Sequence, residues 1–483
     1  MLTLAKDLNI VPEKIAHIHL MGICGTGMAA LAGMLQMSGY KVTGSDSQVY
    51  PPMSVFLSDL NIPVCSGYKA DNLRPAPDLV IVGNVITRKN PEAITLAELK
   101  IPYLSFPQAL SHFYIKDRTS LVITGTHGKT TTCSLLATAL FQAGLDPSFM
   151  IGGIVGEFGT NFRLGGGKYF VAEGDEYDTA FFDKESKFLH YRPHVAVITS
   201  IEFDHADIFD DIEEIKQSFR KFVSLLPHDG LLIANLDDAN VAEIAADAPC
   251  AVQGYGLDHS LMWVVDNITI ENGVSHFDIV KDGAPWSSMT VGLPGRHNCL
   301  NSLAVAAVMH HLGIAPSAIS KGLKNFAGVK RRQEIRGVEN GITVIDDFAH
   351  HPTAVRETLE ALKSGYADRR LVAVFEPRTN SSRRAIFQSD YAGAFDSADL
   401  ILLREPAPIE GLVKEELFSA TRLAADLTNE RKLMAEAFGS TDDILQRLKS
   451  ILKTGDVVAI LSNGGFDNIH IRLLDQIRMT AAG

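Results

Sequence analysis

The chain has 483 residues and a formal net charge of −13, and 46% of it is hydrophobic and 21% charged. This length exceeds what one ordinary hydrophobic core can organise, so we expect two to four domains. The excess of acidic residues argues against a nucleic-acid partner, because that role needs clustered Lys and Arg. An anionic substrate must then be bound locally, by backbone N–H groups and a few placed cations.

The cysteine pattern and the first residues indicate where the protein works. The five cysteines are scattered singly, without the close spacing of a zinc or redox pair, which is typical of a reducing compartment. Charges spread through the first twenty residues argue against a signal peptide, and no apolar run is long enough to span a bilayer. We therefore expect a cytoplasmic protein without membrane insertion. A monomer is the simplest expectation, although the sequence leaves the oligomeric state open.

Three stretches of the chain share one pattern, in which a short β-rich apolar run leads through a tight glycine or polar turn into a helical pattern. They cover residues 15–40, 120–144 and 341–363. Further short apolar runs suit parallel sheets with crossover helices; they cover residues 41–46, 78–84, 195–200, 231–238, 370–377, 399–403 and 456–465. The alternating segment 276–295 predicts an antiparallel edge or a small β insert. The sequence thus predicts three α/β domains, with boundaries at 1–116, 117–328 and 329–483.

The strongest motif follows the apolar run that ends at residue 124 and opens a clear helix. It consists of Gly125, Thr126, His127, Gly128, Lys129, Thr130 and Thr131. A glycine turn at a helix N-terminus points backbone N–H groups at phosphate oxygens, and the helix dipole favours their charge. Lys129 is then placed to reach the β- and γ-phosphates, and the Thr130 hydroxyl to coordinate magnesium. Two residues rather than four separate the glycines, so a mere tight turn is the alternative.

Acidic and histidine residues follow two other apolar runs of the same domain. The cluster 173–178 begins with Glu173, and Asp204 and His205 come just past the run 195–200. Carboxylates at a strand end can hold magnesium, whereas a solvated acidic turn is the alternative. Open α/β sheets bind ligands at the carboxyl ends of their strands, which favours a shared site. Imidazole is an unusual magnesium ligand, so His205 is the least obvious member.

Four further segments are weaker signals. The turn 22–27 resembles a dinucleotide fingerprint with reversed glycine spacing, and it indicates only that a diphosphate can approach the backbone there. Asn298 precedes a helix that it could cap, or it could read an adenine edge. The basic segment 329–334 is either a solvated linker or a phosphate clamp. Residues 346–352 stand where a strand gives way to a helix, again at the ligand edge of a sheet.

Six segments in this order resemble the Mur ligase family over essentially the whole chain: residues 125–132, 173–178, 203–207, 295–301, 328–334 and 346–352. The resemblance implies an N-terminal Rossmann-like domain that binds UDP, a central P-loop ATPase domain with a mostly parallel sheet, and a C-terminal Rossmann-like domain. It also implies ATP and Mg2+ as cofactors. In that family the ATP γ-phosphate passes to a substrate carboxylate, and an amine then attacks the acyl phosphate to form an amide.

The resemblance also implies residue roles. It gives Lys129, Glu173 and His205 catalytic roles, with Thr130, Glu173 and His205 at the metal. Asn298 would contact adenine, and Arg331 and Asp347 would approach the nucleotide from the C-terminal domain. His350 could lie near the reacting centre, with its role open. The UDP-sugar would lie at Gly22, Gly25, Thr26, Gly27, Ser45, Asp46 and Asn84.

One departure from the family pattern points to a branch. Several members carry a carbamylated lysine about four helical turns after the histidine matched by His205, and here that count ends near Arg220. Residues 176–188, 190–193, 375–384 and 462–470 resemble most the branch that joins UDP-N-acetylmuramate to the recycled tripeptide L-alanyl-γ-D-glutamyl-meso-diaminopimelate. The carboxylates of that peptide need cations and adaptable polar partners, and a solvated helix face is the alternative. The peptide-binding set is Arg378, Asn380, Ser381, Arg383, Asn463 and Gly464.

Other functions share some of these motifs. A ligase of de novo peptidoglycan synthesis, with free L-alanine as the acceptor, would use the same ATPase motifs. A non-catalytic nucleotide-sugar sensor could share the fold, but it would not need Lys129, Glu173 or His205. A mechanical P-loop ATPase is disfavoured, since nothing resembles an arginine-finger arrangement.

Overall fold

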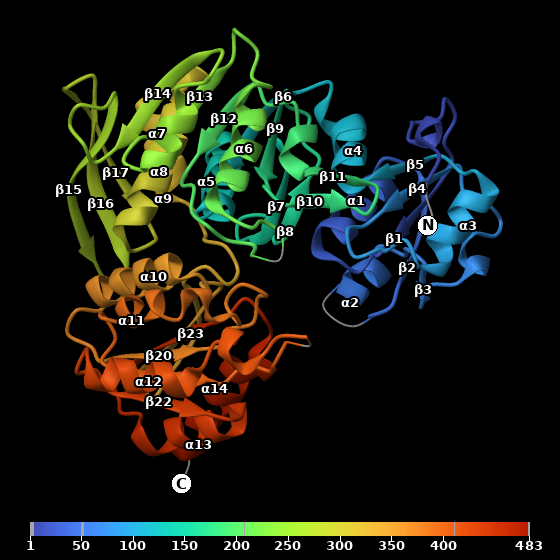
Figure 1. Cartoon of the computed structure of the whole chain (residues 1–483). Coiled ribbons are helices and arrows are strands. Elements are labelled where there is room, and N and C mark those ends of the chain that lie inside the picture. The colour runs from blue at the N-terminus through green and yellow to red at the C-terminus, as the bar shows by residue number, and fades with distance from the viewer. Residues whose placement is uncertain (1–3, 50–52, 207, 410, 482–483) are drawn as a thin grey trace.

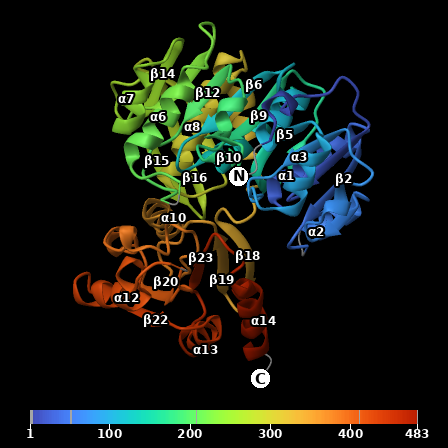
Figure 2. The same cartoon turned by 45° about the vertical axis from the view of Figure 1, so that its right-hand side comes forward.

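The computed structural model describes residues 4–49, 53–206, 208–409 and 411–481. It has three lobes, each built around its own sheet, and the N-terminal and C-terminal lobes contact different sides of the central one (Figure 1). A view turned by 45° shows the same arrangement (Figure 2). Among the helices of the described ranges, none combines the length and apolar character that a bilayer crossing requires.

The N-terminal lobe is a five-stranded parallel sheet in the order β3-β2-β1-β4-β5. Its strands are β1 (His17–Met21), β2 (Lys41–Asp46), β3 (Val64–Ser66), β4 (Leu79–Val82) and β5 (Tyr103–Ser105). Its helices are α1 (Thr26–Met37), α2 (Met53–Asp59), α3 (Pro91–Leu99), α4 (Phe106–Leu110) and a π-helical turn at Ser111–Ile115. The strand order reverses beside β1, and ligands of such sheets bind outside the carboxyl ends at this point.

The central lobe holds a ten-stranded sheet in the order β17-β16-β15-β14-β13-β12-β6-β9-β7-β8. The strands from β15 to β7 in this order run parallel, and β8, β16 and β17 are antiparallel to their neighbours. The strands are β6 (Thr119–Thr124), β7 (Ser148–Val155), β8 (Thr160–Arg163), β9 (Tyr169–Gly174), β12 (Val195–Ile198), β13 (Leu231–Asn235), β14 (Ala251–Gly256), β15 (Trp263–Glu271), β16 (Val274–Lys281) and β17 (Ala284–Val291). A separate hairpin joins β10 (Asp178–Ala180) to β11 (Asp183–Ser186).

Helices cover both faces of the central sheet, which is why its parallel strands are apolar on both sides. One face packs against α5 (Lys129–Gln142), α8 (Arg296–His311) and α9 (Pro316–Lys324). The other packs against α6 (Ile212–Val223) and α7 (Ala239–Ala245), and its core continues into the N-terminal lobe. Shared apolar packing therefore joins the first two lobes.

The C-terminal lobe has a six-stranded sheet in the order β18-β19-β23-β20-β21-β22, parallel except for β18. Its strands are β18 (Glu334–Glu339), β19 (Ile342–Asp347), β20 (Leu371–Phe375), β21 (Leu400–Arg404), β22 (Ala435–Phe438) and β23 (Val457–Leu461). Helices α10 (Pro352–Gly365), α11 (Asp390–Ala394) and α12 (Ala420–Asn429) cover one face, and α13 (Thr441–Ile451) and α14 (Ile469–Ala481) the other. Short 3-10 helices lie at Lys6–Leu8, Ala70–Leu73, Lys187–His190, Ala385–Phe387, Lys414–Glu416 and Phe466–Asn468.

The predicted fold class, three α/β domains with mostly parallel sheets, is confirmed, and the predicted β insert is the antiparallel pair β16 and β17. The hairpin β10–β11 and strand β18 were not predicted, because short polar strands depend on their partners rather than on local pattern. The domain boundaries stay a prediction. The central sheet begins at Thr119 and the third at Glu334.

Candidate active site between the central and C-terminal lobes

The turn between β6 and α5 is held closely by the chain that follows β12. Gly125 and Gly128 have φ of 130° and 78°, and the Thr126 N–H donates to the Ser200 carbonyl at 2.9 Å. A Cβ at Gly125 would lie 2.2 Å from Thr199 Oγ1. Both the backbone conformation and the close packing therefore require glycine here. The turn ends at the N-terminus of a 14-residue helix, which suits it to bind phosphate.

Lys129 projects from the first turn of α5 into a group of carboxylates. Its Nζ donates to the Gly125 carbonyl at 2.6 Å and to Glu176 Oε2 at 3.0 Å. Burial alone would lower the pKa of Lys129, but Glu176, Asp175 and Glu173 outweigh it and hold that pKa above its usual value. The ammonium group is therefore charged and fixed at the phosphate turn.

Thr130 and Glu173 form the pair of oxygen ligands that the sequence predicts. Thr130 Oγ1 donates to Glu173 Oε1 at 2.7 Å, and the Gly152 N–H donates to Oε2 at 2.6 Å. Burial, and then the charge of Asp175, raise the pKa of Glu173. A hard cation would relieve this repulsion, and hydroxyl and carboxylate oxygens are its preferred ligands, so these residues fit magnesium. The Arg332 guanidinium, from the C-terminal side, donates to Thr130 Oγ1 at 3.2 Å.

His205 lies beside the same carboxylates. Its Nε2 is 3.7 Å from Glu176 Oε1, its ring centroid is 4.9 Å from that of Tyr177, and its φ is 54°. Its backbone N–H donates to Asp204 Oδ1 at 2.7 Å. Burial opposes ionisation of Asp204, but His205 and His350 hold its pKa well below the usual range. The structure thus brings His205 to the phosphate turn through Glu176, a residue that the sequence analysis did not single out.

Asn298 and Asp347 both form hydrogen bonds with one intermediate residue, Gln333. The buried Asn298 amide donates to the Pro294 carbonyl at 2.8 Å and to Gln333 Oε1 at 3.3 Å. The Gln333 N–H in turn donates to Asp347 Oδ2 at 2.7 Å. Two predicted nucleotide residues from different lobes therefore contact the same residue, one its side chain and the other its backbone.

Arg331 turns towards its own lobe, whereas its neighbour Arg332 reaches the phosphate turn. Arg331 donates to the carbonyls of Ser462 and Gly464, the latter at 2.7 Å, and its guanidinium lies 5.2 Å from the centre of the Phe348 ring. The basic segment 329–334 was the available signal for Arg332. The sequence could not tell which of the two arginines crosses between the lobes, because that depends on a backbone φ of 61° at Arg331.

A second network links the phosphate turn to α10. Glu202 Oε2 lies 3.2 Å from His127 Nε2 and 3.5 Å from His351 Nδ1, and it accepts from Thr353 Oγ1 at 2.7 Å. The two imidazole centroids are 4.7 Å apart, and His351 Nε2 lies 3.2 Å from the Phe203 carbonyl oxygen. The ligand atoms of His127, Glu202 and His351 lie within 4.8 Å of one another, a spacing that a metal ion can bridge. The hydrogen bonds to Glu202 already satisfy its carboxylate without a metal ion.

Neither Glu202 nor His351 was proposed as a site residue. Glu202 lies in the loop before the predicted His205, and His351 follows His350. Burial opposes ionisation of Glu202, yet contacts with His127 and Thr353 lower its pKa to about 2. The carboxylate is therefore charged at neutral pH and joins the two lobes.

Replacing His351 with Asn is expected to reduce the loss of stability in mild acid. Burial, and then the charge of His127, lower the pKa of His351 from 6.5 to about 4. Between these values the unfolded chain binds more protons, so stability falls as the pH drops from 6.5 to 4, by up to about 3 kcal/mol. Asn keeps the acceptor for the Thr353 N–H at the start of α10. Melting temperatures at pH 7 and 4.5 test this, and an equal fall in both proteins would contradict it.

The N-terminal lobe places its predicted residues at one edge of the sheet. Gly22, with φ of 81°, donates its N–H to the Ser45 carbonyl at 2.8 Å, and the Cys24 N–H donates to Asp46 Oδ2 at 2.9 Å. Asn84 is exposed just past β4. The remaining members lie at the start of α1: Gly25 precedes the helix, and Thr26 and Gly27 are its first two residues. Gly25 and Thr26 are exposed, and Gly27 is half-buried.

The Ser45 side chain differs from its neighbours because it faces the interior. It is fully buried and donates from Oγ to Glu92 Oε2 at 2.5 Å. Glu92 also accepts from Asn72 at 2.5 Å and lies 3.8 Å from His19. The Ser45 side chain therefore packs inside the lobe, behind the edge of the sheet, and its carbonyl accepts the hydrogen bond that positions the glycine turn.

The predicted peptide residues follow the neighbouring strands β20 and β23, so they gather at one sheet edge. Arg378 lies over Gly464, where an added Cβ would be 2.1 Å from Arg378 Cδ. The buried Ser381 Oγ accepts from the Ala206 N–H at 3.1 Å. This edge of the C-terminal lobe therefore meets the central lobe just after His205.

Two polar atoms of this set are buried and have no hydrogen-bond partner among the described residues. They are Arg383 Nε and Asn463 Oδ1. Arg383 is otherwise positioned by Asn380 Oδ1 at 3.2 Å and by the Ala407 carbonyl at 3.4 Å. Buried groups of this kind are expensive to leave unpaired, which favours a polar ligand beside them.

Two other residues that the sequence singled out lie as follows. Arg220, where the family lysine would fall, lies on α6 and pairs with Glu243 and, at 3.4 Å, with Asp247. His350 lies 3.0 Å from the Phe348 carbonyl oxygen through Nδ1, and burial lowers its pKa. Arg220 is thus committed to ion pairs with a carboxylate of α7 and with one just after that helix.

The chain is similar to known proteins along nearly its whole length. Residues 17–118, 123–309 and 331–464 match models described as the Mur ligase family catalytic domain, the Mur ligase middle domain and the Mur ligase glutamate ligase domain. The UDP-N-acetylmuramate–L-alanyl-gamma-D-glutamyl-meso-2,6-diaminoheptandioate ligase of Escherichia coli is 40% identical over 96% of this chain and 99% of its own. The UDP-N-acetylmuramate–L-alanine ligase of Geobacter sp. is 35% identical over 97% and 99%.

Solved structures agree with these sequence matches. The crystal structure of a murein peptide ligase from Psychrobacter arcticus has a TM-score of 0.71 and 35% identity, covering 96% of this chain and 99% of the other. The phosphate turn, the buried carboxylates beside it and the three sheets therefore occur in a chain that aligns with these proteins from end to end. On this evidence the chain belongs to the Mur ligase family.

Proposed function

We propose that the protein joins UDP-N-acetylmuramate to L-alanyl-γ-D-glutamyl-meso-diaminopimelate through an acyl phosphate, as an ATP-dependent ligase of peptidoglycan recycling. Relatives named for this pair of substrates match the chain at 39% and 40% identity over 96% of its length. The observation that carries the chemistry is the group formed by Lys129, Thr130 and Glu173 at a glycine turn. It offers one fixed cation and two oxygen ligands where the phosphates of ATP would lie.

ATP is expected to place its β- and γ-phosphates at the N-terminus of α5. The backbone N–H groups of the turn and Lys129 would hold the phosphate oxygens. Thr130, Glu173 and His205 would hold magnesium, with Glu176 beside His205 at 3.7 Å. Bound magnesium supplies positive charge that offsets the charge of the phosphate oxygens. Asn298 would contact the adenine, and Arg331 and Asp347 would border the nucleotide from the C-terminal lobe.

The reaction has two steps. A carboxylate oxygen of UDP-N-acetylmuramate attacks the γ-phosphorus, the bond to the β-phosphate oxygen breaks, and ADP leaves. The peptide amine then attacks the carbonyl carbon of the acyl phosphate, inorganic phosphate leaves, and the nitrogen loses a proton to give the amide. Because two anions must meet, positioning and charge neutralisation supply most of the catalysis. The contacts of Arg332 with Thr130 and of Ser381 with Ala206 would keep water from the acyl phosphate.

The remaining sites divide between the two outer lobes. The edge formed by the turn 22–27, Asp46 and Asn84 would bind the UDP-sugar. Carboxylates of the peptide would lie against Arg378 and Arg383, with Asn463 as a polar partner. Arg383 Nε and Asn463 Oδ1, which are buried without a hydrogen-bond partner among the described residues, support this assignment.

A direct assay separates this proposal from its alternatives. Purified protein would be incubated with ATP, magnesium and UDP-N-acetylmuramate, together with either the tripeptide or free L-alanine, and phosphate release and sugar-nucleotide product would be measured. Turnover with the tripeptide and little with alanine is expected. Preferred turnover with alanine would keep the ATPase assignment and overturn the peptide site. No turnover with either acceptor would favour a non-catalytic nucleotide-sugar sensor.

Replacing Arg383 with Ala is expected to raise KM for the tripeptide about 10- to 100-fold with a smaller change in kcat. A charge-assisted hydrogen bond to a carboxylate is worth roughly 1.5–3 kcal/mol, which corresponds to this range. Steady-state kinetics with varied tripeptide measures it. Arg422, which is 72% exposed, offers a matched control as Arg422→Ala. An unchanged KM, or an equal effect in the control, would place Arg383 outside the peptide site.

A further inference from the structure

A separate cavity lies at the opposite edge of the central sheet from the phosphate turn. Its volume is about 670 Å³, and it is bordered by Thr119, Lys168 and His194. These residues stand at or just before the starts of β6, β9 and β12, whereas the phosphate turn follows the other end of β6. A six-residue strand is about 20 Å long, so the cavity is distinct from the proposed active site.

Cations dominate the border of this cavity. Lys116, Arg118, Lys168 and Arg192 line it, and Asp117 is the one carboxylate among the described residues that do so. None of the four cations forms an ion pair with a carboxylate within the described ranges, and Arg118 donates instead to a backbone carbonyl, that of Tyr114, at 2.8 Å. Such a group is notable in a chain of net charge −13. It forms a local positive potential that an anion would neutralise.

The pKa of the neighbouring His112 is also affected by the positive charge of these cations. Burial lowers the pKa of His112, and the charges of Lys116 and Arg192 lower it further. These two cations lie far apart in the chain, since Lys116 precedes β6 and Arg192 precedes β12. The charges are therefore brought together by the fold, not by proximity in the sequence.

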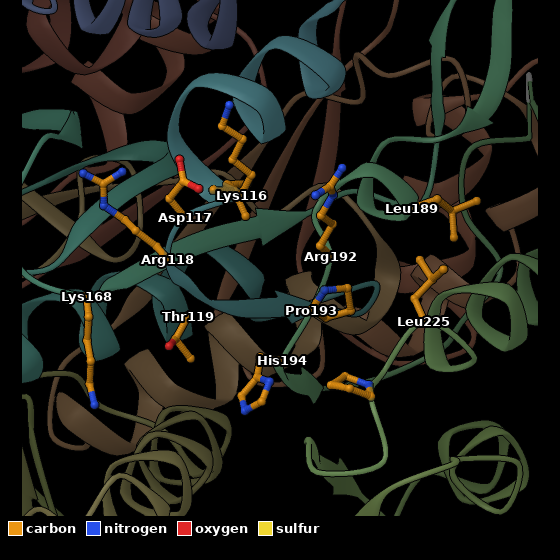
Figure 3. Close-up of a pocket in the computed structure, with 12 residues that line it drawn as sticks. Lys116, Asp117, Arg118, Thr119, Lys168, Leu189, Arg192, Pro193, His194 and Leu225 are labelled. Atoms are coloured by element: carbon orange, nitrogen blue, oxygen red, sulfur yellow. The ribbon is translucent and has the colours of Figure 1, made fainter.

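The cavity also has an apolar side. In Figure 3, Arg118 and Lys168 lie on one side, Leu189 and Leu225 on the other, and Arg192 between them. The backbone beneath is rigid, because the Thr119 N–H donates to the Lys168 carbonyl at 2.8 Å and the His194 N–H donates to the Ser120 carbonyl at 3.0 Å. The cavity thus matches a ligand with an anionic head and an apolar body.

We infer that this cavity binds a small organic phosphate, with its phosphate against Lys116, Arg118 and Arg192 and its apolar body against Leu189 and Leu225. Lys and Arg recognise phosphate by charge and by forked hydrogen bonds, respectively. The site is independent of the proposed ligase site. Because residues 115–119 connect the first two lobes, a bound phosphate would tie that connection to the central sheet.

Hydrogen–deuterium exchange with phenyl phosphate as the probe tests this site. With phenyl phosphate bound, exchange is expected to be slower in peptides that cover 115–119 and 189–194. The charge reversal Lys116→Glu with Arg192→Glu should abolish this protection. Protection at the phosphate turn 125–131 should be the same in both proteins, which shows that the variant is folded. Inorganic phosphate should need about tenfold higher concentration for the same protection, since it covers none of the apolar side.

A matched variant and a second anion complete the design. Lys321→Glu with Lys449→Glu makes the same change of charge at two exposed positions outside the cavity and should keep full protection. Benzoate, which has the same ring and one charge, should protect less than phenyl phosphate. The inference is overturned by absent protection at 115–119, by protection that survives the reversal at Lys116 and Arg192, or by equal protection from benzoate.

Discussion

Replacing Lys129 with Met is expected to lower kcat for ligation by about three orders of magnitude or more. Met fills nearly the same volume but carries no charge, so the transferred phosphate loses its fixed cation in a buried site. The Nζ contacts at 2.6 Å with the Gly125 carbonyl and at 3.0 Å with Glu176 place that charge at the turn. Phosphate release with UDP-N-acetylmuramate and the tripeptide measures the loss. Activity above a tenth of wild type would contradict the role given to Lys129.

The same substitution removes the partner of buried carboxylates, so its effect on folding must be separated from its effect on catalysis. Glu176, which is 3% exposed, would keep an uncompensated charge, and breaking such a pair costs several kcal/mol. The double variant Lys129→Met with Glu176→Gln removes that charge and should recover thermal stability. It should stay inactive, because the cation is still missing. Recovered activity in the double variant would show that Lys129 acts only through folding.

Replacing Glu173 with Gln is expected to lower kcat about 10²- to 10⁴-fold and to raise the magnesium concentration needed for half-maximal rate. The change keeps shape but removes the negative charge, and it turns an NH₂ group towards either Thr130 Oγ1 or the Gly152 N–H. The site then loses its buried anionic oxygen ligand for a hard cation. A magnesium titration of the reaction rate measures both changes.

The control for Glu173→Gln should change charge without touching the site. Glu98 is exposed on α3 of the N-terminal lobe, and Glu98→Gln should leave both the rate and the magnesium dependence unaltered. Because burial and Asp175 raise the pKa of Glu173, the neutral amide should not destabilise the fold strongly. A Glu173→Gln protein with an unchanged magnesium requirement would remove Glu173 from the proposed metal site.

Sequence reasoning reached the parts of the site that depend on local geometry. Lys129 and Thr130 stand in a strand–turn–helix, so their placement at a helix N-terminus follows from neighbouring residues alone. Glu173 and His205 follow strands of one parallel sheet, and the carboxyl ends of such strands share an edge. The resulting expectation, that these side chains gather beside the turn, matches the distances that link Thr130 to Glu173 and His205 to Glu176.

The missed residues are those whose partners are remote in the sequence. Glu202 meets Thr353, and Thr130 meets Arg332, only when the C-terminal lobe docks on the central one. Ser45, one residue before the end of β2, is predicted to bind the UDP-sugar, but the period-two alternation of the strand turns its side chain inward to Glu92. Pattern alone cannot assign the face of a strand that is buried on both sides.

By itself, the sequence determined the family, the three α/β units and the phosphate turn, because each rests on contiguous residues that favour one local structure. Only the tertiary structure decided which arginine crosses to the turn and which carboxylate stands beside His205. It also decided that the cations preceding β6, β9 and β12 border one cavity. These outcomes depend on which strands become neighbours and how the lobes dock. Both follow from burying apolar surface over the whole chain, which no single segment specifies.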